Sequence, residues 1–532
     1  MISTDFDVIV VGTGPAGVSA AYPLVEAGLK VLLIDGGKTA EPALPSGSYL
    51  TNRREDPMQW KWMVGHDYHA LKNLNSVSPK LRVPTHAHVF EGFVSATQIT
   101  TDNFVAVGSL ARGGLSNAWG CGVARLSAAE LEAFPFPPKS LDVGYEATAR
   151  RMGISGATDD ALSGYFGLDA WADPPIPLDG LNTRLIEKYQ RIRLRAGRAD
   201  VLLGRSRVAA LSRDRGERKA CNLSGNCMWG CERQSLYSAT TDLKKLRQFE
   251  NLTYRSGFVV NAVSRSEDQC AVNGSGAKGA ETLTSTKLIL AAGTLATTRL
   301  ALAALSLYDP VPLQSSPTAA FMLWLPAALG TARVDAFGLG QLSFTLPLKD
   351  DMTGFGSLFS TNGIPIAEFS RYMPFAKRFG IDILSTLMSS CLVGNVFLPG
   401  KMSTTMLAHN ADGRLAISGS YRGDMPEVIA EAERKLRTFF WGLGAVMLPK
   451  SFKLSAPGSD IHYAATLPMQ ARPQRGQTSA FGELYGLKGI YIADGASLPS
   501  VSEKSHTLTI MANAMRIGSH VAQSFKTPQG PE

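Results

Sequence analysis

The feature that most constrains this chain is its opening stretch, FDVIVVGTGPAGVSAAYPLVEAGLKVLLIDGG, at residues 6–37. The apolar run Val8–Val11 predicts a buried parallel strand, and a second strand pattern, KVLLID, ends on Asp35. Between them lie a helical pattern and three glycines at GxGxxG spacing, Gly12, Gly14 and Gly17. In such a unit the glycines permit a tight turn, the approach of a pyrophosphate and close helix packing, while the acid accepts a hydrogen bond from a ribose hydroxyl. The stretch therefore predicts a dinucleotide site.

The size and charge of the chain limit the classes of protein to consider. Its 532 residues, 45% hydrophobic and 18% charged, are enough for two or three globular domains. The formal net charge of +8 favours anionic partners, but no basic run interleaves with aromatic residues, so nucleic acid is not an expected partner. A second apolar strand pattern at 287–292, closing on Gly293, suits a nucleotide-binding domain that is split in sequence.

The sequence also gives an expectation for localisation. The N-terminus runs directly into a strand pattern, without the basic and apolar segments of a signal peptide, which favours a cytoplasmic protein with reduced thiols. The longest charge-free stretch, Ile383–Gly400, contains several polar residues and is expected to be a buried core element. Membrane association is therefore not expected.

Three further segments carry a resemblance to a known family. ARGGLSNAWGCGV (111–123) resembles the glycine-rich segment that passes the flavin ring in glucose–methanol–choline (GMC) oxidoreductases. GSDIHYAATLPM (458–469) resembles the segment bearing that family's first catalytic histidine, and residues 486–521 resemble its C-terminal strand, Asp-containing turn and last helix. The forms GGLSNAW and HYAATLPM look closest to the pyranose-oxidising branch.

The resemblance implies a fold class and a division into domains. The expected fold is α/β, or α+β overall, with a Rossmann-like FAD-binding domain that is discontinuous in sequence and a substrate domain with a mainly antiparallel sheet and flanking helices. The FAD-binding domain is expected at 1–125, 200–310 and 455–532, a helical cap at 126–199, and the substrate-binding domain at 311–454.

The resemblance also implies the cofactor and the site residues. Flavin-dependent oxidation of an alcohol needs a base for the hydroxyl proton while the carbinol hydride passes to flavin N5, and a neutral imidazole suits that base. By resemblance, His462 is the base and His506 its partner. Asn117 stands where some relatives carry a histidine covalently linked to flavin, so FAD is expected to be held without a covalent bond. The expected cofactor-binding residues are Gly12, Gly14, Pro15, Ala16, Gly17, Asp35, Gly113, Gly114, Ser116, Asn117, Val260, Ala292, Gly293, Asp494, His506 and Thr507.

The function expected from these features is oxidation of a CH–OH group to a carbonyl on a sugar, a glycoside or a sugar-containing metabolite. Oxygen and an unidentified carrier both stay open as the electron acceptor. Three alternatives also stay open: oxidation of a sterol or lipid-like alcohol, an FAD and iron–sulfur electron-transfer subunit, and a lyase that keeps FAD for structure.

The iron–sulfur alternative depends on the segment CNLSGNCMWGC, which holds Cys221, Cys227 and Cys231. Structural zinc wants four ligands and common iron–sulfur clusters want four cysteines, whereas this segment supplies three thiols. Cys121 is a distant candidate for a fourth. The segment is therefore expected to be a reduced structural loop, and no metal site is predicted.

Overall fold

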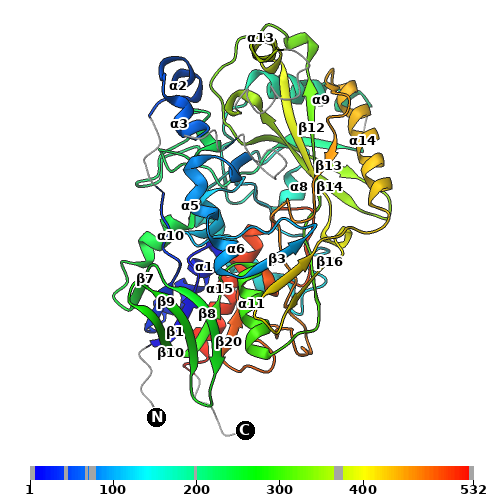
Figure 1. Cartoon of the computed structure of the whole chain (residues 1–532). Coiled ribbons are helices and arrows are strands. Elements are labelled where there is room, and N and C mark those ends of the chain that lie inside the picture. The colour runs from blue at the N-terminus through cyan, green and yellow to red at the C-terminus, as the bar shows by residue number, and fades with distance from the viewer. Residues whose placement is uncertain are drawn as a thin grey trace.

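The computed structural model describes residues 6–40, 46–65, 70, 79–196, 200–364 and 376–526. Within this part the chain forms two large sheets, each with helices packed on it, and two smaller sheets (Figure 1). The first strand, β1, and the last helix, α15, both lie in the lower half of the molecule in that view. The α-helices are α1 Pro15–Glu26, α2 Tyr49–Glu55, α3 Gln59–Met63, α5 Ala87–Phe90, α6 Phe93–Ala96, α7 Asp142–Met152, α8 Ser163–Phe166, α9 Gly180–Ala196, α10 Ala239–Leu246, α11 Thr294–Leu305, α13 Lys377–Met388, α14 Met425–Gly442 and α15 Thr507–Gln523.

The first sheet has a parallel centre with an antiparallel extension. Its order is β7-β2-β1-β10-β9-β8, with β20 also pairing with β10, and the pairs among β7, β2, β1, β10 and β20 are parallel. The prediction of a Rossmann-like unit is confirmed, because the chain crosses from β1 through α1 to a neighbouring parallel strand. The strands are β1 Phe6–Val11, β2 Val31–Ile34, β7 Leu252–Arg255, β8 Val259–Arg265, β9 Cys270–Gly276, β10 Gly279–Leu290 and β20 Ile490–Ile492.

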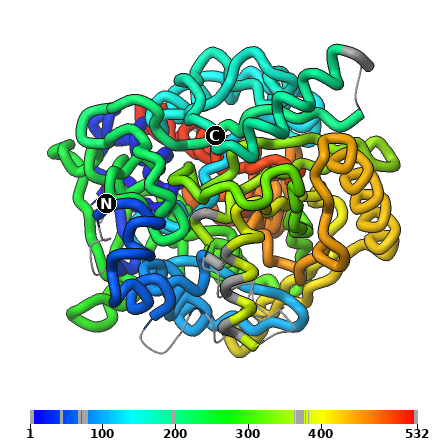
Figure 2. Tube along the Cα trace, turned by 90° about the horizontal axis from the view of Figure 1, so that it is seen from above, coloured from blue at the N-terminus to red at the C-terminus, as the bar shows by residue number. Residues whose placement is uncertain are grey.

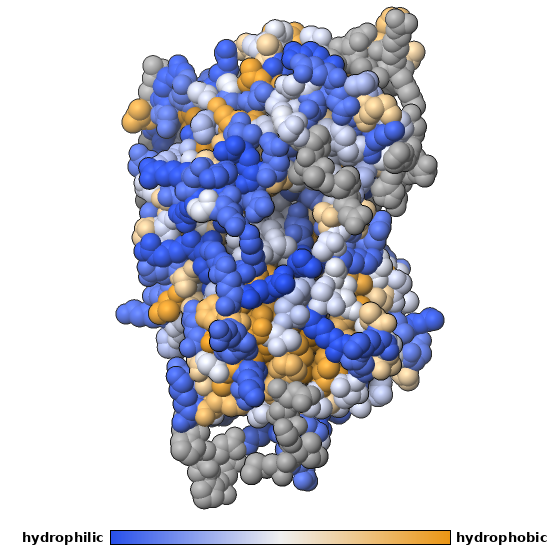
Figure 3. Space-filling view, turned by 90° about the vertical axis from the view of Figure 1, so that its left-hand side faces the viewer, coloured by the Kyte–Doolittle hydropathy of each residue, from blue (hydrophilic) through white to orange (hydrophobic). Residues whose placement is uncertain are grey.

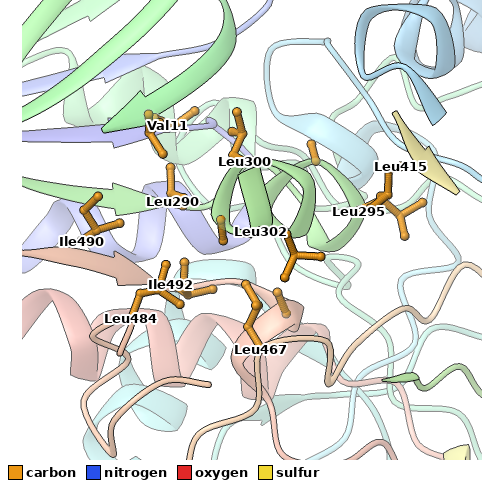
Figure 4. Packing of buried hydrophobic residues seen from close by; sticks show 14 of the residues in the cluster. Val11, Leu290, Leu295, Leu300, Leu302, Leu415, Leu467, Leu484, Ile490 and Ile492 are labelled. Carbon is orange, nitrogen blue, oxygen red and sulfur yellow. The ribbon is translucent and has the colours of Figure 1, made fainter. Parts of the chain in front are cut away.

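Helices bury both faces of this sheet, which explains its continuous apolar strands. Side chains alternate between the two faces of a strand, so Val8 and Val10 pack in one cluster with α1 and α15, while Ile9 and Val11 pack in another with α11. Figure 4 shows the second cluster, in which leucines of α11 lie between the sheet and Leu415. The covered faces leave the carboxyl ends of the parallel strands as the place for a ligand.

The second large sheet is antiparallel, in the order β18-β12-β15-β14-β13-β6, with β19 also pairing with β12. One face is apolar and packs against α9 and α14, where Phe344 of the sheet meets Phe440 of α14 at 5.8 Å between ring centroids. In the view from above, the segment from about residue 130 to 200 runs along one side of the molecule (Figure 2). The strands are β6 Leu202–Arg205, β12 Thr318–Trp324, β13 Gly340–Pro347, β14 Thr353–Ser360, β15 Cys391–Phe397, β18 Val446–Met447 and β19 Lys453–Leu454.

The smaller sheets and the helix α7 join distant parts of the chain. A four-stranded sheet, β11-β16-β17-β3, pairs an early strand with later ones, and β4 pairs with β5. The helix α7 packs on α15, so closely that a Cβ on Gly144 would lie 2.5 Å from the carbonyl oxygen of Ala512, whereas α9 packs on the second sheet. The domain limits stay a prediction. The strands are β3 Ile99–Asp102, β4 Ile154–Ser155, β5 Ala172–Asp173, β11 Val311–Leu313, β16 Thr405–His409 and β17 Leu415–Ser418.

The side of the molecule seen in Figure 3 is mostly hydrophilic, with hydrophobic residues gathered in its lower part. None of the helices in the described ranges is long and apolar enough to cross a bilayer.

Candidate cofactor and active site

The loop between β1 and α1 can be built only with glycine at two positions. Gly12 has a φ of 106°, and a Cβ there would lie 2.3 Å from the carbonyl oxygen of Ala291. A Cβ on Gly17 would lie 1.8 Å from the carbonyl oxygen of Gly12, so the helix could not approach the loop. At Gly14, by contrast, φ is −66° and a Cβ would meet no atom within 4 Å. The loop therefore faces open space at its second glycine, where a pyrophosphate would approach.

The first turn of α1 follows this open space. The helix begins at Pro15, continues with Ala16, and has no side-chain cap at its N-terminus. Pro15 suits the first helical position because its missing N–H would have no intrahelical partner there. The uncapped N–H groups of this turn and the helix dipole both favour an anion at this end.

Asp35 follows β2 at the same edge, but its carboxylate is already engaged by protein donors. Thr13 donates a short hydrogen bond to Oδ2, and the backbone N–H of Gly37 donates to Oδ1 at 2.9 Å. The Tyr254 hydroxyl lies 3.0 and 3.1 Å from the two oxygens. Burial raises the pKa of Asp35, and these hydrogen bonds act against that rise. Asp35 is thus a fixed acceptor with limited capacity left for a ribose hydroxyl.

Thr13 and Tyr254 are the two residues at this end that sequence reasoning missed. Thr13 is the variable position inside the glycine motif, and its Oγ1 also accepts from the N–H of Gly113 at 3.0 Å, so it joins two loops. Tyr254 lies in β7, more than 200 residues after Asp35, and no motif marks it. Only the parallel pairing of β2 with β7 brings it to the carboxylate.

The segment around Gly113 lies directly against the glycine motif. A Cβ on Gly114 would lie 3.2 Å from the Cα of Gly14, and Gly113 has a φ of 81°. Ser116 donates to the carbonyl of Gly113 at 2.6 Å and accepts from the backbone of Ala239, which braces the turn. The backbone of this segment, rather than the Ser116 hydroxyl, is therefore presented to the open space.

Asn117 has the same bracing character. Its amide donates to the carbonyls of Arg112 and Gly114 at 2.8 and 2.9 Å, and its Oδ1 accepts from Ser238 at 2.9 Å. Every polar atom of this side chain thus serves the loop. An amide offers no nucleophile for a bond to flavin, which agrees with the expectation of non-covalent FAD.

Asp494 ties two strand ends together at the same edge. Its Oδ2 accepts from the N–H of Gly293 at 2.9 Å and from the Thr297 hydroxyl at 2.5 Å, and its Oδ1 accepts from the N–H of Ala496 at 3.0 Å. The N–H of the neighbouring Ala292 donates to Thr297. Burial raises the pKa of Asp494 to about 6. Asp494 therefore fixes the turn that begins α11, and a Cβ on Gly293 would meet open space.

Val260 lies near the Asp35 end of the edge. It is a partly buried residue of β8 that packs on the core beneath α11, next to a register shift between residues 260 and 262. Two residues earlier, the N–H of Phe258 donates to the carbonyl of Asp35 at 2.8 Å. The segment that joins β7 to β8 therefore lies next to Asp35, at the expected adenine end.

These features fit FAD. The open space at Gly14 and Gly293, the uncapped start of α1 and the acceptor Asp35 lie along one edge of the first sheet, in the order that a dinucleotide would need. The helix α15 begins at Thr507, also without a side-chain cap, after the N-cap residue His506. Its free N–H groups and dipole would favour the negative charge of a reduced flavin.

His462 and His506 are 44 residues apart in the chain, yet they contact each other. Their ring centroids are 5.2 Å apart and the rings are nearly perpendicular, at 79°. Within the described residues, the Nδ1 atoms of both rings are buried without a hydrogen-bond partner. A buried structural histidine normally has such a partner, as His86 has in the carbonyl of Met228 at 2.9 Å. The pair therefore keeps its nitrogen atoms available.

Burial keeps both imidazoles neutral. It lowers the pKa of His462 to about 4, and burial together with the neighbouring His462 lowers the pKa of His506 to about 3. His462 is partly buried and keeps some of its surface exposed. A neutral imidazole at neutral pH can accept a proton there.

A buried carboxylate holds the turn that carries His462. Asp460 Oδ2 accepts from the backbone N–H of His462 at 3.1 Å and from that of Ser316 at 2.8 Å. Ile461, which lies between Asp460 and His462 in the chain, has a φ of 62°, a backbone conformation that is unfavourable for a β-branched residue. Sequence reasoning missed Asp460 because its role depends on a contact with a strand connection more than 140 residues away.

The loop of three cysteines fastens other segments together. Trp229, which is fully buried, stacks on Tyr49 at 5.0 Å and donates to the carbonyl of Met63 at 3.1 Å. Asn226 donates to the carbonyl of Gly47 at 2.9 Å. The loop therefore holds the chain around residues 47–63 in place.

The thiols of this loop are free. Burial raises the pKa of Cys221 to about 11 and that of Cys121 to about 12, so these thiols are protonated at neutral pH. Lys80 lies near Cys121 and Cys227. Across the described ranges, no three His, Cys, Asp or Glu side chains are grouped so that they could hold a metal ion.

Comparison with known proteins bears on this site. Residues 6–109 match the family model described as pyridine nucleotide-disulphide oxidoreductase, and residues 448–514, which hold both histidines, match the model described as GMC oxidoreductase. The comparison with curated proteins finds no match.

Two solved structures have the same fold over almost the whole chain. Pyridoxine 4-oxidase from Mesorbium loti has a TM-score of 0.57 and 15% identity, covering 98% of this chain and 99% of the other. Formate oxidase has a TM-score of 0.61 and 14% identity, with the same two shares. The nucleotide edge, the uncapped helix and the histidine pair lie in one fold, and the segment that holds the pair matches the GMC oxidoreductases, so the chain is an FAD-dependent oxidoreductase with a GMC-type C-terminal segment.

Proposed function

We propose that this enzyme oxidises a secondary alcohol on a sugar, a glycoside or a sugar-containing metabolite to a carbonyl, with His462 as the base and His506 as its partner. The observation that carries the proposal is the contact between two neutral imidazoles at the start of α15, beside the open edge of the nucleotide sheet. FAD, when bound, supplies the acceptor for the hydride of the carbinol carbon.

The protein's own residues handle the proton. No partner for Nε2 of His462 is present in the described ranges, so this atom can accept the hydroxyl proton of an alcohol. His506, 5.2 Å away between ring centroids, can hold the same oxygen by a second hydrogen bond. The packing of Phe397 on His462, with centroids 4.9 Å apart, excludes water from one side of the base.

The alternative of a sterol or lipid-like alcohol receives less support. The apolar segments 318–330 and 381–398 favour it in the sequence. In the fold, Phe321 and Leu323 of β12 and Leu392 and Val396 of β15 belong to the core beneath α14. These four side chains are used for packing and therefore do not line the site.

An anaerobic substrate panel tests the proposal. We expect sugars or glycosides to bleach the flavin absorbance of the purified holoenzyme, and sterols to leave it unchanged.

Iron analysis of the same sample tests the electron-transfer alternative, because iron near one cluster per chain would contradict a simple flavin oxidoreductase. Oxygen consumption with the reducing substrate then distinguishes an oxidase from a dehydrogenase.

The low pKa of His462 predicts an unusual pH profile. Because its imidazole stays unprotonated down to about pH 4, we expect the rate of flavin reduction to be constant from about pH 5.5 to 8 and to fall only as the pH approaches about 4. Stopped-flow reduction at saturating substrate, with flavin retention checked by fluorescence at each pH, measures this. An activity that declines with a midpoint near the usual histidine value of about 6.5 would contradict the assignment.

A further inference from the structure

The face of the second sheet that α9 and α14 do not cover carries an ordered set of side chains. Phe355 of β14 and Phe397 of β15 lie directly opposite each other across the strands. The next pair on the same face is Ser357 and Asn395, because side chains two residues apart share a face. Ser343 of β13 lies opposite Ser357 and extends this line.

Hydrogen bonds join these polar side chains into one row. Ser206 and Ser343 are 2.8 Å apart through their hydroxyls, and Ser343 and Ser357 are 3.1 Å apart. Asn395 accepts from the backbone N–H of Ser357 at 3.0 Å through Oδ1. We call Ser206, Ser343, Ser357 and Asn395 the polar row.

The bond to Oδ1 fixes which way the Asn395 amide points. With its oxygen turned to Ser357, its two N–H donors point away, and they have no partner among the residues that the structure describes. Ser357 and Asn395 both keep part of their surface exposed, and Ala320, opposite Asn395 on β12, is exposed. The row thus presents oriented hydrogen-bonding groups on an accessible surface.

The polar row is continuous with the catalytic pair through the aromatic residues. Phe397 contacts His462 at 4.9 Å between centroids, and Asn395 lies two residues back along the same strand, about 7 Å away. On the other side, Tyr165 stacks on Phe355 at 5.6 Å and donates to Glu503, which is in the segment that leads to His506. The base His462, the ring of Phe397 and the polar row therefore lie one after another.

We infer that Asn395 and Ser357 determine specificity, by binding a second hydroxyl of a polyhydroxylated ring whose carbinol is held at His462 and whose apolar face lies on Phe397. The inference rests on the proposed function. A ring hydroxyl both donates and accepts, so it can pair with the Asn395 amide and the Ser357 hydroxyl. A ring with a single hydroxyl would leave these groups unpaired after it displaced their water, and such a site discriminates strongly against it.

The test compares rings of one size that differ in hydroxyls. Anaerobic flavin reduction is measured in the wild-type holoenzyme and in Asn395→Asp with cyclohexanol and with a panel of D-glucose, D-galactose, D-xylose, methyl glucopyranosides and myo-inositol. The variant keeps the oxygen that accepts from Ser357 but loses the amide donors. We expect KM for the best panel member to rise about ten- to hundred-fold with kcat nearly unchanged, and KM for cyclohexanol to change little.

A matched control is Asn273→Asp. Asn273 is also an asparagine in an antiparallel pair, and its Oδ1 accepts from the Thr282 hydroxyl at 2.6 Å on the exposed β9–β10 hairpin. It should leave both substrate classes unaffected. If Asn395→Asp binds no FAD, Ser357→Ala is the second test variant. We again expect KM to rise for the polyhydroxylated panel and to change little for cyclohexanol.

Three results would overturn the inference. One is an Asn395→Asp variant that uses the panel as well as wild type does, which would leave the proposed alcohol oxidation intact. Another is an equal loss for cyclohexanol and the panel, which indicates general damage. The third is a wild-type enzyme that is reduced by cyclohexanol but by no polyhydroxylated ring, which would also refute the sugar part of the proposed function.

Discussion

Replacing His462 with alanine is expected to slow flavin reduction by about 10²- to 10⁴-fold at saturating substrate, the usual range for loss of a positioned general base. The variant keeps only His506 of the pair, so the proton would have to pass to the residue that orients the oxygen or to water. Stopped-flow reduction with the best substrate of the panel, under nitrogen, measures the rate constant directly and separates it from reoxidation.

His409→Ala is the matched control for this variant. His409 is also buried, its Nδ1 also lacks a partner in the described ranges, and burial lowers its pKa, but it stacks on Tyr308 at 5.9 Å in the small sheet. Its removal should cost stability and leave the reduction rate within about twofold of wild type. If His462→Ala, with FAD bound, reduced the flavin at the wild-type rate, His462 would not be the base.

Replacing Gly14 with alanine is expected to weaken FAD binding by about 100-fold, which corresponds to about 2.7 kcal/mol. The added Cβ would meet no protein atom within 4 Å, and φ at this position is −66°, so the chain should fold normally. The methyl group would instead occupy the space through which the pyrophosphate approaches the backbone. Titration of the apoprotein with FAD, followed by flavin fluorescence, gives the change in Kd.

The control uses a glycine that is equally open but remote. A Cβ on Gly442, an exposed residue of α14, would also meet no atom within 4 Å, so Gly442→Ala should bind FAD as wild type does. Gly17→Ala should instead damage the fold, because the new Cβ would lie 1.8 Å from the carbonyl oxygen of Gly12. We expect this variant to have a lower melting temperature as well as a lower FAD content. Normal FAD affinity in Gly14→Ala would place the cofactor elsewhere.

The glycine motif shows how far sequence reasoning reaches for a local structure. Strand, turn, helix and acid all lie within residues 6–35, and the steric limit at Gly17 arises inside the motif, from the carbonyl oxygen of Gly12. The limit at Gly12 comes instead from the distant Ala291, which only the fold brings to the loop. The position of Asp35 at the strand end is predictable from the sequence, yet its hydrogen-bond partners are not, since Tyr254 arrives by strand pairing.

The histidine pair also shows what sequence reasoning cannot predict, namely the contacts between residues far apart in the chain. Resemblance proposes His462 and His506 as partners, but their contact, their low pKa values and the support from Asp460 depend on how the loop at 460–462 packs against the start of α15. The polar row is not visible in the sequence at all, because Ser206, Ser343, Ser357 and Asn395 lie on four separate segments with no shared motif.

The sequence by itself determined the nucleotide-binding unit, the cofactor class and the two histidine segments, because glycine sterics, strand periodicity and short motifs act over a few neighbouring residues. Only the tertiary structure decided which distant side chains meet: Tyr254 with Asp35, His462 with His506, and Asn395 with Ser357. Those contacts depend on the order and register of the strands, which place whole segments next to each other. Residues that meet in this way share no local pattern in the chain.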